Sequence, residues 1–356
     1  MPLNCQAHSP TRTRIVFAIH LAASAFFGQL LQDSCRIARA EPAGKTRLAT
    51  EGTQFTVNGT PTFLLGISYY SALGASETAW RQDLEELKRR GFNWIRVWAT
   101  WAAFGNDVSA VDENGQPREP YLGRLRRLVS ECDRLGIVVD VTLSRGNGVT
   151  GPARLQSLAA HARAVDTIAS SLKPFSNWYL DLANERNIRD RRFVPLAELR
   201  ALRAHVRKVD PRRLVTASHA GDMSSDDVAQ YLNVVGVDFL APHRPRRPGS
   251  PRETAQRIRQ LIGWAKQSGR VVPVLCQEPF RRGFDRSRWE PAAEDYVLDL
   301  QEAMRAGAAG WCFHNGDQRD RPDGRPRRSF DLREKSLFEQ FDAEEHKALT
   351  LIRAVR

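Results

Sequence analysis

The sequence predicts an α/β protein built as a (β/α)8 TIM barrel with an N-terminal β-hairpin. Eight short apolar segments recur along the chain, and a segment with helical periodicity follows almost every one. The strands are apolar on both faces, which is typical of parallel strands covered by helices. The count of eight favours a closed barrel over an open doubly wound sheet.

Residues 1–40 have the pattern of a signal peptide, and we exclude them from the fold. Two Arg residues precede an apolar run from Ile15 to Leu31, and Ala38-Arg39-Ala40 supplies small residues around a cleavage point. Polar residues interrupt the run, which favours a cleaved signal over a permanent membrane anchor. We therefore expect an exported protein, periplasmic or secreted, with no stable membrane span after cleavage and one domain over residues 41–356.

The elements of that domain follow in order. Asn58-Gly59 is a strong turn pair within residues 55–63, which predicts the hairpin before the first barrel strand. The predicted strands are Leu64–Ser68, Trp94–Trp98, Val138–Leu143, Trp178–Leu182, Val215–Ser218, Val237–Leu240, Val271–Cys276 and Gly310–Phe313. The predicted helices are Thr78–Arg90, Tyr121–Leu135, Leu155–Leu172, Leu196–Val209, a short one over Asp226–Tyr231, Pro251–Gln267, Ala292–Arg305 and Glu334–Arg353. Glycines 91, 136 and 269 stand where helices should end.

Charge does not point to a nucleic-acid partner. The net charge is +12, and about +9 remains without the leader, which holds four Arg and one Asp. The Arg residues are spread over helices and loops without a helix-turn-helix, zinc or ribonucleoprotein motif. Two clusters, Arg244–Arg247 and Arg319–Arg328, fall in predicted loops, where they contact either a charged sugar or water.

Cysteine usage argues against a disulfide scaffold or a metal site. Outside the leader the chain keeps Cys132, Cys276 and Cys312, an odd number. Cys276 and Cys312 lie at matching places on the seventh and eighth strands, so pairing between them stays open beside two buried thiols. No His/Cys cluster has zinc-ligand spacing and no glycine loop fits a nucleotide, so we expect neither metal nor cofactor.

Two Glu residues stand at carboxyl ends of strands, where TIM barrels place their active sites. Glu185 follows the fourth strand and Glu278 follows the seventh. These strands are three steps apart around the ring, so their ends face each other across the barrel mouth. A retaining glycosidase needs two carboxyl groups about 5–5.5 Å apart, and an inverting one about 6.5–9.5 Å.

The run Asp181-Leu182-Ala183-Asn184-Glu185 resembles the strand-four signature of the clan of retaining barrel glycoside hydrolases that includes cellulases and β-mannanases. In that clan a Glu ending strand seven is the nucleophile, and Glu278 is the matching position. The resemblance extends from Phe55 to Trp311. It implies hydrolysis of a β-linked glycan through a covalent glycosyl-enzyme intermediate, with Glu185 as general acid/base.

The same resemblance implies roles for three substrate-site residues. Arg96 falls where the clan has an Arg that hydrogen-bonds the nucleophile, Trp311 where an aromatic floor underlies the sugar, and Asn184 where a side chain binds the 2-hydroxyl. Arg96 should lower the pKa of Glu278, because a nearby cation favours the carboxylate. Burial and the Glu278 charge should raise the pKa of Glu185, because an acid must hold its proton.

The chain departs from the clan beside these residues. Pro242-His243-Arg244 stands where the clan often has a Tyr after strand six, and Pro279-Phe280 follows Glu278 in place of an aromatic residue and Gly. His243 either substitutes for that Tyr or is a structural histidine, as is His219 after strand five. Four aromatic residues are candidate surfaces for sugar rings or core residues: Tyr69, Tyr70, Trp98 and Trp101.

The sequence therefore supports two hypotheses of different functional class. The first is hydrolysis of an oligo- or polysaccharide, with endo or exo action, linkage and oligomeric state open. The second is a non-catalytic carbohydrate-binding barrel, which the unusual neighbours of Glu278 favour. The two differ in whether Glu278 forms a covalent bond with the sugar.

Overall fold

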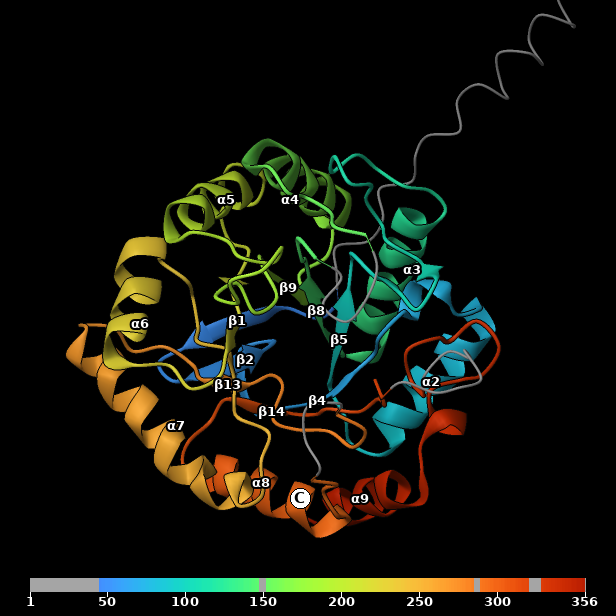
Figure 1. Cartoon of the computed structure of the whole chain (residues 1–356), viewed down its shortest axis with the longest axis vertical. Coiled ribbons are helices and arrows are strands. Elements are labelled where there is room, and N and C mark those ends of the chain that lie inside the picture. The colour runs from blue at the N-terminus through green and yellow to red at the C-terminus, as the bar shows by residue number, and fades with distance from the viewer. Residues whose placement is uncertain (1–44, 147–151, 285–288, 320–327, 356) are drawn as a thin grey trace, which may run out of the picture. The chain divides into compact units, whose positions relative to one another are not determined.

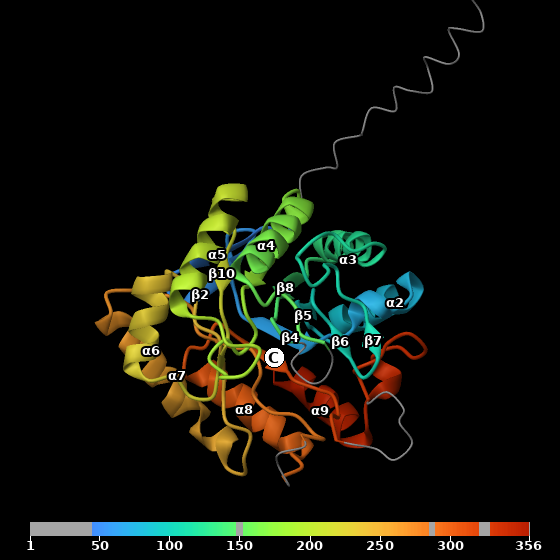
Figure 2. The same ribbon diagram turned by 45° about the horizontal axis from the view of Figure 1, so that its top comes forward.

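The computed structural model describes residues 45–146, 152–284, 289–319 and 328–355, which belong to one compact unit. Strands occupy the centre of this unit and helices form a ring around them (Figure 1). The tilted view shows the helices standing side by side around the same centre (Figure 2). The predicted signal peptide lies outside the described residues. Within the described ranges, no helix is long and apolar enough to cross a membrane.

Seven parallel strands form the main sheet, in the order β10-β9-β8-β5-β4-β14-β13. Along the chain they are β4 (Leu64–Ser68), β5 (Trp94–Trp98), β8 (Val138–Thr142), β9 (Trp178–Asp181), β10 (Val215–Thr216), β13 (Leu275–Cys276) and β14 (Gly310–Phe313). The sixth barrel strand is β12 (Pro242–His243), which pairs in parallel with β11 (His219–Ala220) after the fifth strand. A parallel bridge from Leu240 to Val274 connects it to the seventh strand. The predicted (β/α)8 barrel is confirmed.

Strands six and seven differ from the prediction. The sequence placed them at Val237–Leu240 and Val271–Cys276, whereas the structure has regular pairing only at Pro242–His243 and Leu275–Cys276. Proline explains part of this difference, because Pro242 and Pro273 have no N–H to donate to a ladder. The two strands still meet, since the N–H of Leu240 donates to Pro273 O.

Eight α-helices are described around the sheet. They are α2 (Glu77–Arg89), α3 (Tyr121–Leu135), α4 (Leu158–Leu172), α5 (Leu196–Val209), α6 (Ser225–Ala229), α7 (Ser250–Gln267), α8 (Ala293–Arg305) and α9 (Ala343–Ala354). Helix α9 begins later than predicted, because the side chain of Asp342 caps it and accepts from the N–H of Glu345. A π-helical segment, Gln230–Val235, extends the short α6.

The predicted hairpin is confirmed, and the structure adds a strand to it. Strands β1 (Leu48–Glu51), β2 (Gln54–Val57) and β3 (Thr60–Thr62) form an antiparallel sheet. From this sheet Phe55 packs edge-on against Phe239, with ring centroids 5.1 Å apart. Phe55 also joins a buried cluster with the first residues of several barrel strands, such as Leu64 and Trp94. The small sheet therefore closes the amino-terminal end of the barrel.

Side chains along each barrel strand alternate between the interior and the helix layer. Trp94 fills the interior near the amino-terminal end, and a Cβ on Gly66 would lie 2.0 Å from its ring, so the neighbouring strand must have glycine there. The two candidate partners Cys276 and Cys312 are free thiols in different clusters, on the helix side and in the interior respectively. Above the apolar floor the interior side chains become polar, at the carboxyl ends of the strands.

Candidate active site

Arg96 lies at the centre of this polar layer and is fully buried. Its Nη1 donates to Glu278 Oε1, and its Nη2 donates to Asn184 Oδ1 at 2.8 Å. Two buried carboxylates complete its surroundings, with Asp140 Oδ2 at 3.1 Å from Nε and Asp181 Oδ2 at 3.3 Å from Nη2. One guanidinium from strand two thus positions groups from strands three, four and seven, as the sequence predicted for Glu278.

Glu278 is 4% exposed and follows β13. Its Oε2 lies 2.6 Å from Arg246 Nη2, 3.4 Å from His314 Nε2 and 3.5 Å from His243 Nδ1. Burial raises the pKa of Glu278, but the positive charges around it, among them those of Arg96 and Arg246, outweigh burial and hold that pKa well below its ordinary value. Glu278 is therefore a carboxylate at neutral pH, as a nucleophile must be.

Glu185 follows β9 in a left-handed backbone conformation, with φ at +49°. That conformation costs a non-glycine residue about 1–2 kcal/mol, and the backbone N–H, which donates to Ser218 Oγ at 2.9 Å, helps to hold it. The side chain points to the mouth, where Oε2 accepts from Arg192 Nη1 at 3.1 Å. Its Oε1 lies 3.3 Å from His243 Nδ1 and 4.0 Å from Arg246 Nη2.

The expected direction of the Glu185 pKa shift is wrong for the free protein. Burial and the Glu278 charge do raise the pKa of Glu185, as predicted, but the hydrogen bond with His243 and the charges of His243 and Arg246 outweigh both. The net pKa lies below the ordinary value of 4.5. Both carboxyl groups are therefore ionised in the free protein at neutral pH.

The two carboxylates face each other closely. One oxygen of Glu185 and one of Glu278 lie within 4.8 Å of each other, and a ring nitrogen of His243 lies within the same distance of both. So close an approach of single oxygens favours the arrangement of retaining glycosidases, whose carboxyl groups are roughly 5–5.5 Å apart, over that of inverting ones, whose carboxyl groups are roughly 6.5–9.5 Å apart. The three side chains also have donor atoms suited to a metal ion, but Arg192 and Arg246 already bind these oxygens, and their charge opposes a cation.

His243 joins the two carboxylates to the barrel interior. Its Nε2 lies 3.0 Å from Gln277 Oε1, and Gln277 Nε2 donates to Asp140. Because the amide nitrogen of Gln277 faces a carboxylate, its oxygen is left to accept the Nε2–H of His243. The other ring nitrogen, Nδ1, then faces Glu185 and Glu278.

A second histidine, His314, is fully buried after β14. Arg281 Nη1 lies 2.8 Å from its Nε2, and Ser68 Oγ lies 2.8 Å from its Nδ1. Since a guanidinium only donates, Nε2 must accept, and the ring proton is on Nδ1. Burial lowers the pKa of His314 well below its ordinary value, so the ring is neutral.

Buried aromatic rings pack beside the polar layer. Tyr70 stacks on Trp98 with ring centroids 4.3 Å apart and planes 19° apart. The Arg96 guanidinium lies over the Trp98 ring at 4.3 Å. Trp98, which the sequence proposed for sugar binding, therefore lies beside the residue that holds Glu278.

Tyr69 and Trp311 are not brought to the mouth, although both were expected to bind substrate. Tyr69 Oη donates to Asp83 in α2 at 2.8 Å, and Trp311 Nε1 donates to Asp299 in α8 at 2.6 Å. Both side chains are fully buried on the helix side of the barrel. Successive side chains of a strand point to opposite faces, so Tyr69 and Trp311 point to the helices. The side chains that point inward at this end of the barrel are Tyr70 after β4 and His314 after β14.

His219 stands at the edge of the site. Its Nδ1 lies 3.2 Å from Tyr231 Oη and its Nε2 lies 3.3 Å from Asn187 Nδ2. Burial lowers the pKa of His219 to about 4, so it is neutral at pH 7. The structure brings four further residues to the site: Tyr70, Arg192, Arg246 and His314. Two of them had a signal in the sequence, Tyr70 as a candidate surface for sugar rings and Arg246 as a member of the Arg244–Arg247 cluster.

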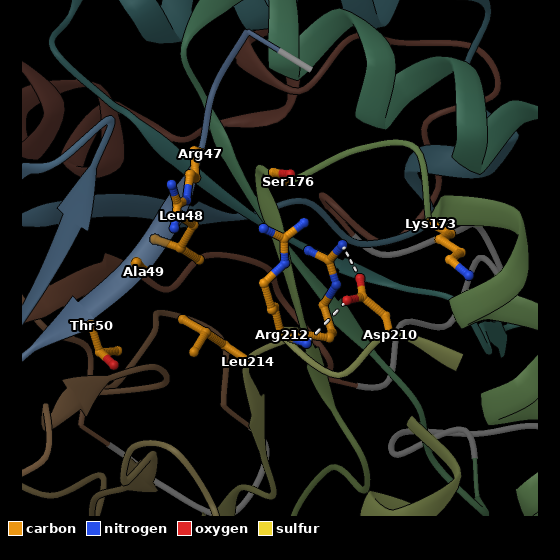
Figure 3. A pocket seen from close by; sticks show the side chains of 10 residues that line it. Arg47, Leu48, Ala49, Thr50, Lys173, Ser176, Asp210, Arg212 and Leu214 are labelled. Atoms are coloured by element: carbon orange, nitrogen blue, oxygen red, sulfur yellow. Dashed lines mark hydrogen bonds and ion pairs between the residues drawn. The ribbon is translucent and has the colours of Figure 1, made fainter. Parts of the chain in front are cut away.

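A pocket of about 380 Å³ lies at the other end of the barrel (Figure 3). Its lining comes from β1 and from the segments that precede β9 and β10, including Arg47, Lys173 and Arg212. Asp210 pairs there with Arg213 at 2.8 Å. TIM-barrel chemistry takes place at the carboxyl ends of the strands, so this pocket is not the candidate active site.

No family model matches the sequence, and no curated protein matches it. Solved structures match over most of the chain. A glycoside hydrolase family 5 mannosidase from Rhizomucor miehei aligns over 87% of this chain and 97% of its own, with a TM-score of 0.61 and 15% identity. The chain shares the fold of family 5 glycoside hydrolases.

Two bacterial structures extend this likeness. A family 5 glycoside hydrolase from Bacteroides vulgatus aligns over 89% of this chain and 72% of its own, with a TM-score of 0.64 and 16% identity. An endo-1,4-β-D-mannanase from Thermotoga petrophila aligns over 83% of this chain and 99% of its own, with a TM-score of 0.54 and 16% identity. At this identity the family 5 fold is shared, and the chemistry must be argued from the site itself.

Proposed function

We propose that this chain is a retaining glycoside hydrolase that cleaves a β-linked glycan. The observation that carries the proposal is the pair Glu185 and Glu278, whose carboxylate oxygens lie within 4.8 Å across the barrel mouth. The family 5 fold of the structures named mannosidase and mannanase supports it. Arg96 supports it further, because it fixes one oxygen of the nucleophile and keeps it ionised.

The reaction would proceed in two displacements. A carboxylate oxygen of Glu278 attacks the anomeric carbon while the bond to the leaving oxygen breaks, and that oxygen takes a proton from Glu185. In the second step Glu185, now ionised, takes a proton from water, and the water oxygen displaces Glu278 from the anomeric carbon. Two inversions give net retention, and neither step requires a metal.

The other residues position the reactants. Asn184, held by Arg96 at 2.8 Å, lies beside Glu185 and is suited to contact a sugar hydroxyl. Trp98 and Tyr70 are buried, and Tyr70 and Arg96 cover the Trp98 ring, so these aromatic side chains support the wall of the site beside Glu278. His243 contacts both carboxylates and is suited to order them relative to each other.

One observation favours the second candidate, a carbohydrate-binding barrel without turnover. In the free protein Arg192 and Arg246 bind the carboxylates, and the general acid lacks its proton. If no substrate weakens these contacts, the site binds sugar but cannot protonate a leaving group. The two candidates therefore differ in turnover, not in affinity.

The test is a screen of β-glycans and aryl β-glycosides of gluco and manno configuration, followed by NMR of the first product formed. Hydrolysis that releases the β-anomer first is the expected result. Initial release of the α-anomer would mean inversion. Binding of a sugar without turnover of any substrate in the panel would favour the non-catalytic barrel.

The pKa of Glu185 predicts an acidic pH optimum. The reactive form needs Glu185 protonated and Glu278 ionised, and the pKa of each lies below its ordinary value of 4.5, that of Glu278 furthest. As pH rises above the pKa of Glu185, the protonated fraction falls about tenfold per unit, so kcat/KM should fall in the same way. Below the pKa of Glu278 the nucleophile is lost.

Arg192→Gln should move the alkaline limb of this profile more than the acid limb. It removes a cation that contacts Glu185 at 3.1 Å, so the pKa of Glu185 rises and kcat/KM persists to higher pH. The acid limb should move less, because Arg192 forms an ion pair with Glu185 and acts on Glu278 only through its charge at longer range. The exposed neighbour Arg191→Gln is the matched control. An unmoved alkaline limb in Arg192→Gln would contradict the assignment of that limb to Glu185.

A further inference from the structure

Arg281 is a buried cation without an acidic partner in the described part of the chain. It is 5% exposed, and no carboxylate of the described residues lies within the 4.0 Å of an ion pair. Both of its hydrogen bonds come from Nη1 and go to neutral acceptors, Tyr70 Oη at 3.0 Å and His314 Nε2 at 2.8 Å. Its Nε has no hydrogen-bond partner. Burying a charge in this way is costly unless something else pairs with it.

The position of Arg281 connects it to the proposed nucleophile. It lies on the loop after β13, close behind Glu278 in sequence. Its partner His314 has its Nε2 3.4 Å from Glu278 Oε2, so one neutral imidazole separates the guanidinium from the carboxylate. A group bound over Glu278 would therefore lie within reach of Arg281.

A second cation stands on the same side. The guanidinium of Arg246 lies 4.6 Å from the Phe284 ring centroid, and that of Arg281 lies 5.5 Å from it. Arg246 shares the charge of Glu278, whereas Arg281 forms no ion pair with any carboxylate of the described residues. The side of the mouth next to the nucleophile therefore carries an excess of positive charge, which attracts an anion.

We propose that the sugar bound over Glu278 carries an anionic group, a uronic-acid carboxylate or a sulfate ester, which pairs with Arg281. This inference rests on the proposed function and names the substrate class as an acidic β-glycan. The planar fork of a guanidinium matches the paired oxygens of a carboxylate or sulfate, and because both N–H groups of Nη1 donate to Tyr70 and His314, the edge formed by Nε and Nη2 is the one that would bind the anion. A neutral hydroxyl group would leave Arg281 without an acidic partner in the described part of the chain.

The same anion has a consequence for the general acid. A negative group near Arg246 would compete with Glu185 and Glu278 for that guanidinium, which now lies 4.0 Å and 2.6 Å from them. If Arg246 interacts less strongly with Glu185, the pKa of Glu185 rises and the protonated form is favoured. An acidic substrate would thus promote the protonated Glu185 that the reaction needs and that the free protein lacks at neutral pH.

The test is calorimetric titration of the folded protein with three matched methyl β-glycosides: the neutral hexoside, its 6-sulfate and the hexuronide, each in gluco and manno configuration. At least one anionic sugar should bind about 30-fold or more tighter than its neutral counterpart. A stronger response to the uronide or to the sulfate identifies the source of the anion. Equal affinity for all three, including no measurable binding of any, overturns the inference.

Variants locate the effect on Arg281. Arg281→Gln should lose most of the preference for the anion, and Arg281→Lys, which keeps the charge, should retain part of it. Arg247→Gln removes an exposed charge that pairs with Glu253 and is the matched control, expected to keep the full preference. A thermal melt of each variant confirms that it is folded. Unchanged preference in Arg281→Gln contradicts the assignment.

Failure of this inference and failure of the proposed function are distinguishable. Turnover of neutral aryl glycosides without any anion preference overturns the inference and leaves the hydrolase standing. Binding of anionic sugars through Arg281 without turnover of the matching aryl uronide or sulfated glycoside overturns the hydrolase and leaves the anion site standing.

Discussion

Glu278→Gln is expected to lower kcat/KM by roughly 10⁵-fold on every glycoside that the protein cleaves. The amide keeps the size of the side chain but cannot attack the anomeric carbon. Steady-state assays on an aryl glycoside measure the loss, and the pH profile of the residual rate should lack the acid limb that we assign to Glu278.

Stability must be separated from chemistry in this variant. Glu278→Gln removes one anion from Arg96, but Asp140 and Asp181 remain at 3.1 and 3.3 Å, so the variant should fold. The cost should stay below the roughly 3–5 kcal/mol of a fully broken buried pair, which urea unfolding measures. Glu51→Gln, at the exposed end of β1, is the matched control. A folded Glu278→Gln protein with wild-type activity would contradict the proposed mechanism.

Glu185→Ala should have the second largest effect, and its size should depend on the leaving group. Removing a general acid costs about 10²- to 10⁴-fold when the departing oxygen needs a proton. A dinitrophenyl glycoside needs none, so its first step should be nearly unaffected, and a burst of dinitrophenol should precede slow hydrolysis of the glycosyl-enzyme. Stopped-flow absorbance measures the burst.

Added azide provides an independent check of Glu185→Ala. Azide attacks the anomeric carbon without a general base, so it should accelerate the second step and give the β-glycosyl azide. Glu113→Ala, in an exposed loop, should respond to neither azide nor leaving group. Equal losses on good and poor leaving groups, with no rescue, would contradict the acid/base role.

The sequence predicted the barrel well because its strands and helices are strongly patterned. Three strands, β4, β5 and β14, match the predicted bounds. The strands that contain Pro242 and Pro273 deviate, because proline changes backbone pairing without changing the apolar pattern that marks a strand. The start of α9 deviates because the capping box of Asp342 lies within a stretch that also has helical composition.

The site was predicted less completely, since sequence position alone does not give side-chain direction. Tyr69 and Tyr70 are adjacent, and only the pleat decides that the second faces the mouth. Trp311 and His314 differ in the same way. Arg192, Arg246 and Arg281 follow strands on long loops, where a flexible side chain reaches the site only through the loop conformation. Glu185 and Arg96 could be found because a local motif or a strand holds each of them.

The measurement that tests the central claim most directly is covalent trapping with a 2-deoxy-2-fluoro glycoside of a substrate that the screen identifies. The fluorine slows both formation and hydrolysis of the glycosyl-enzyme. A reactive leaving group makes formation faster than hydrolysis, so the glycosyl-enzyme accumulates. Intact-mass and peptide mass spectrometry should find one sugar per chain, attached to Glu278 and absent from Glu278→Gln. A label on another residue, or turnover of the parent glycoside with no label at all, would contradict the account.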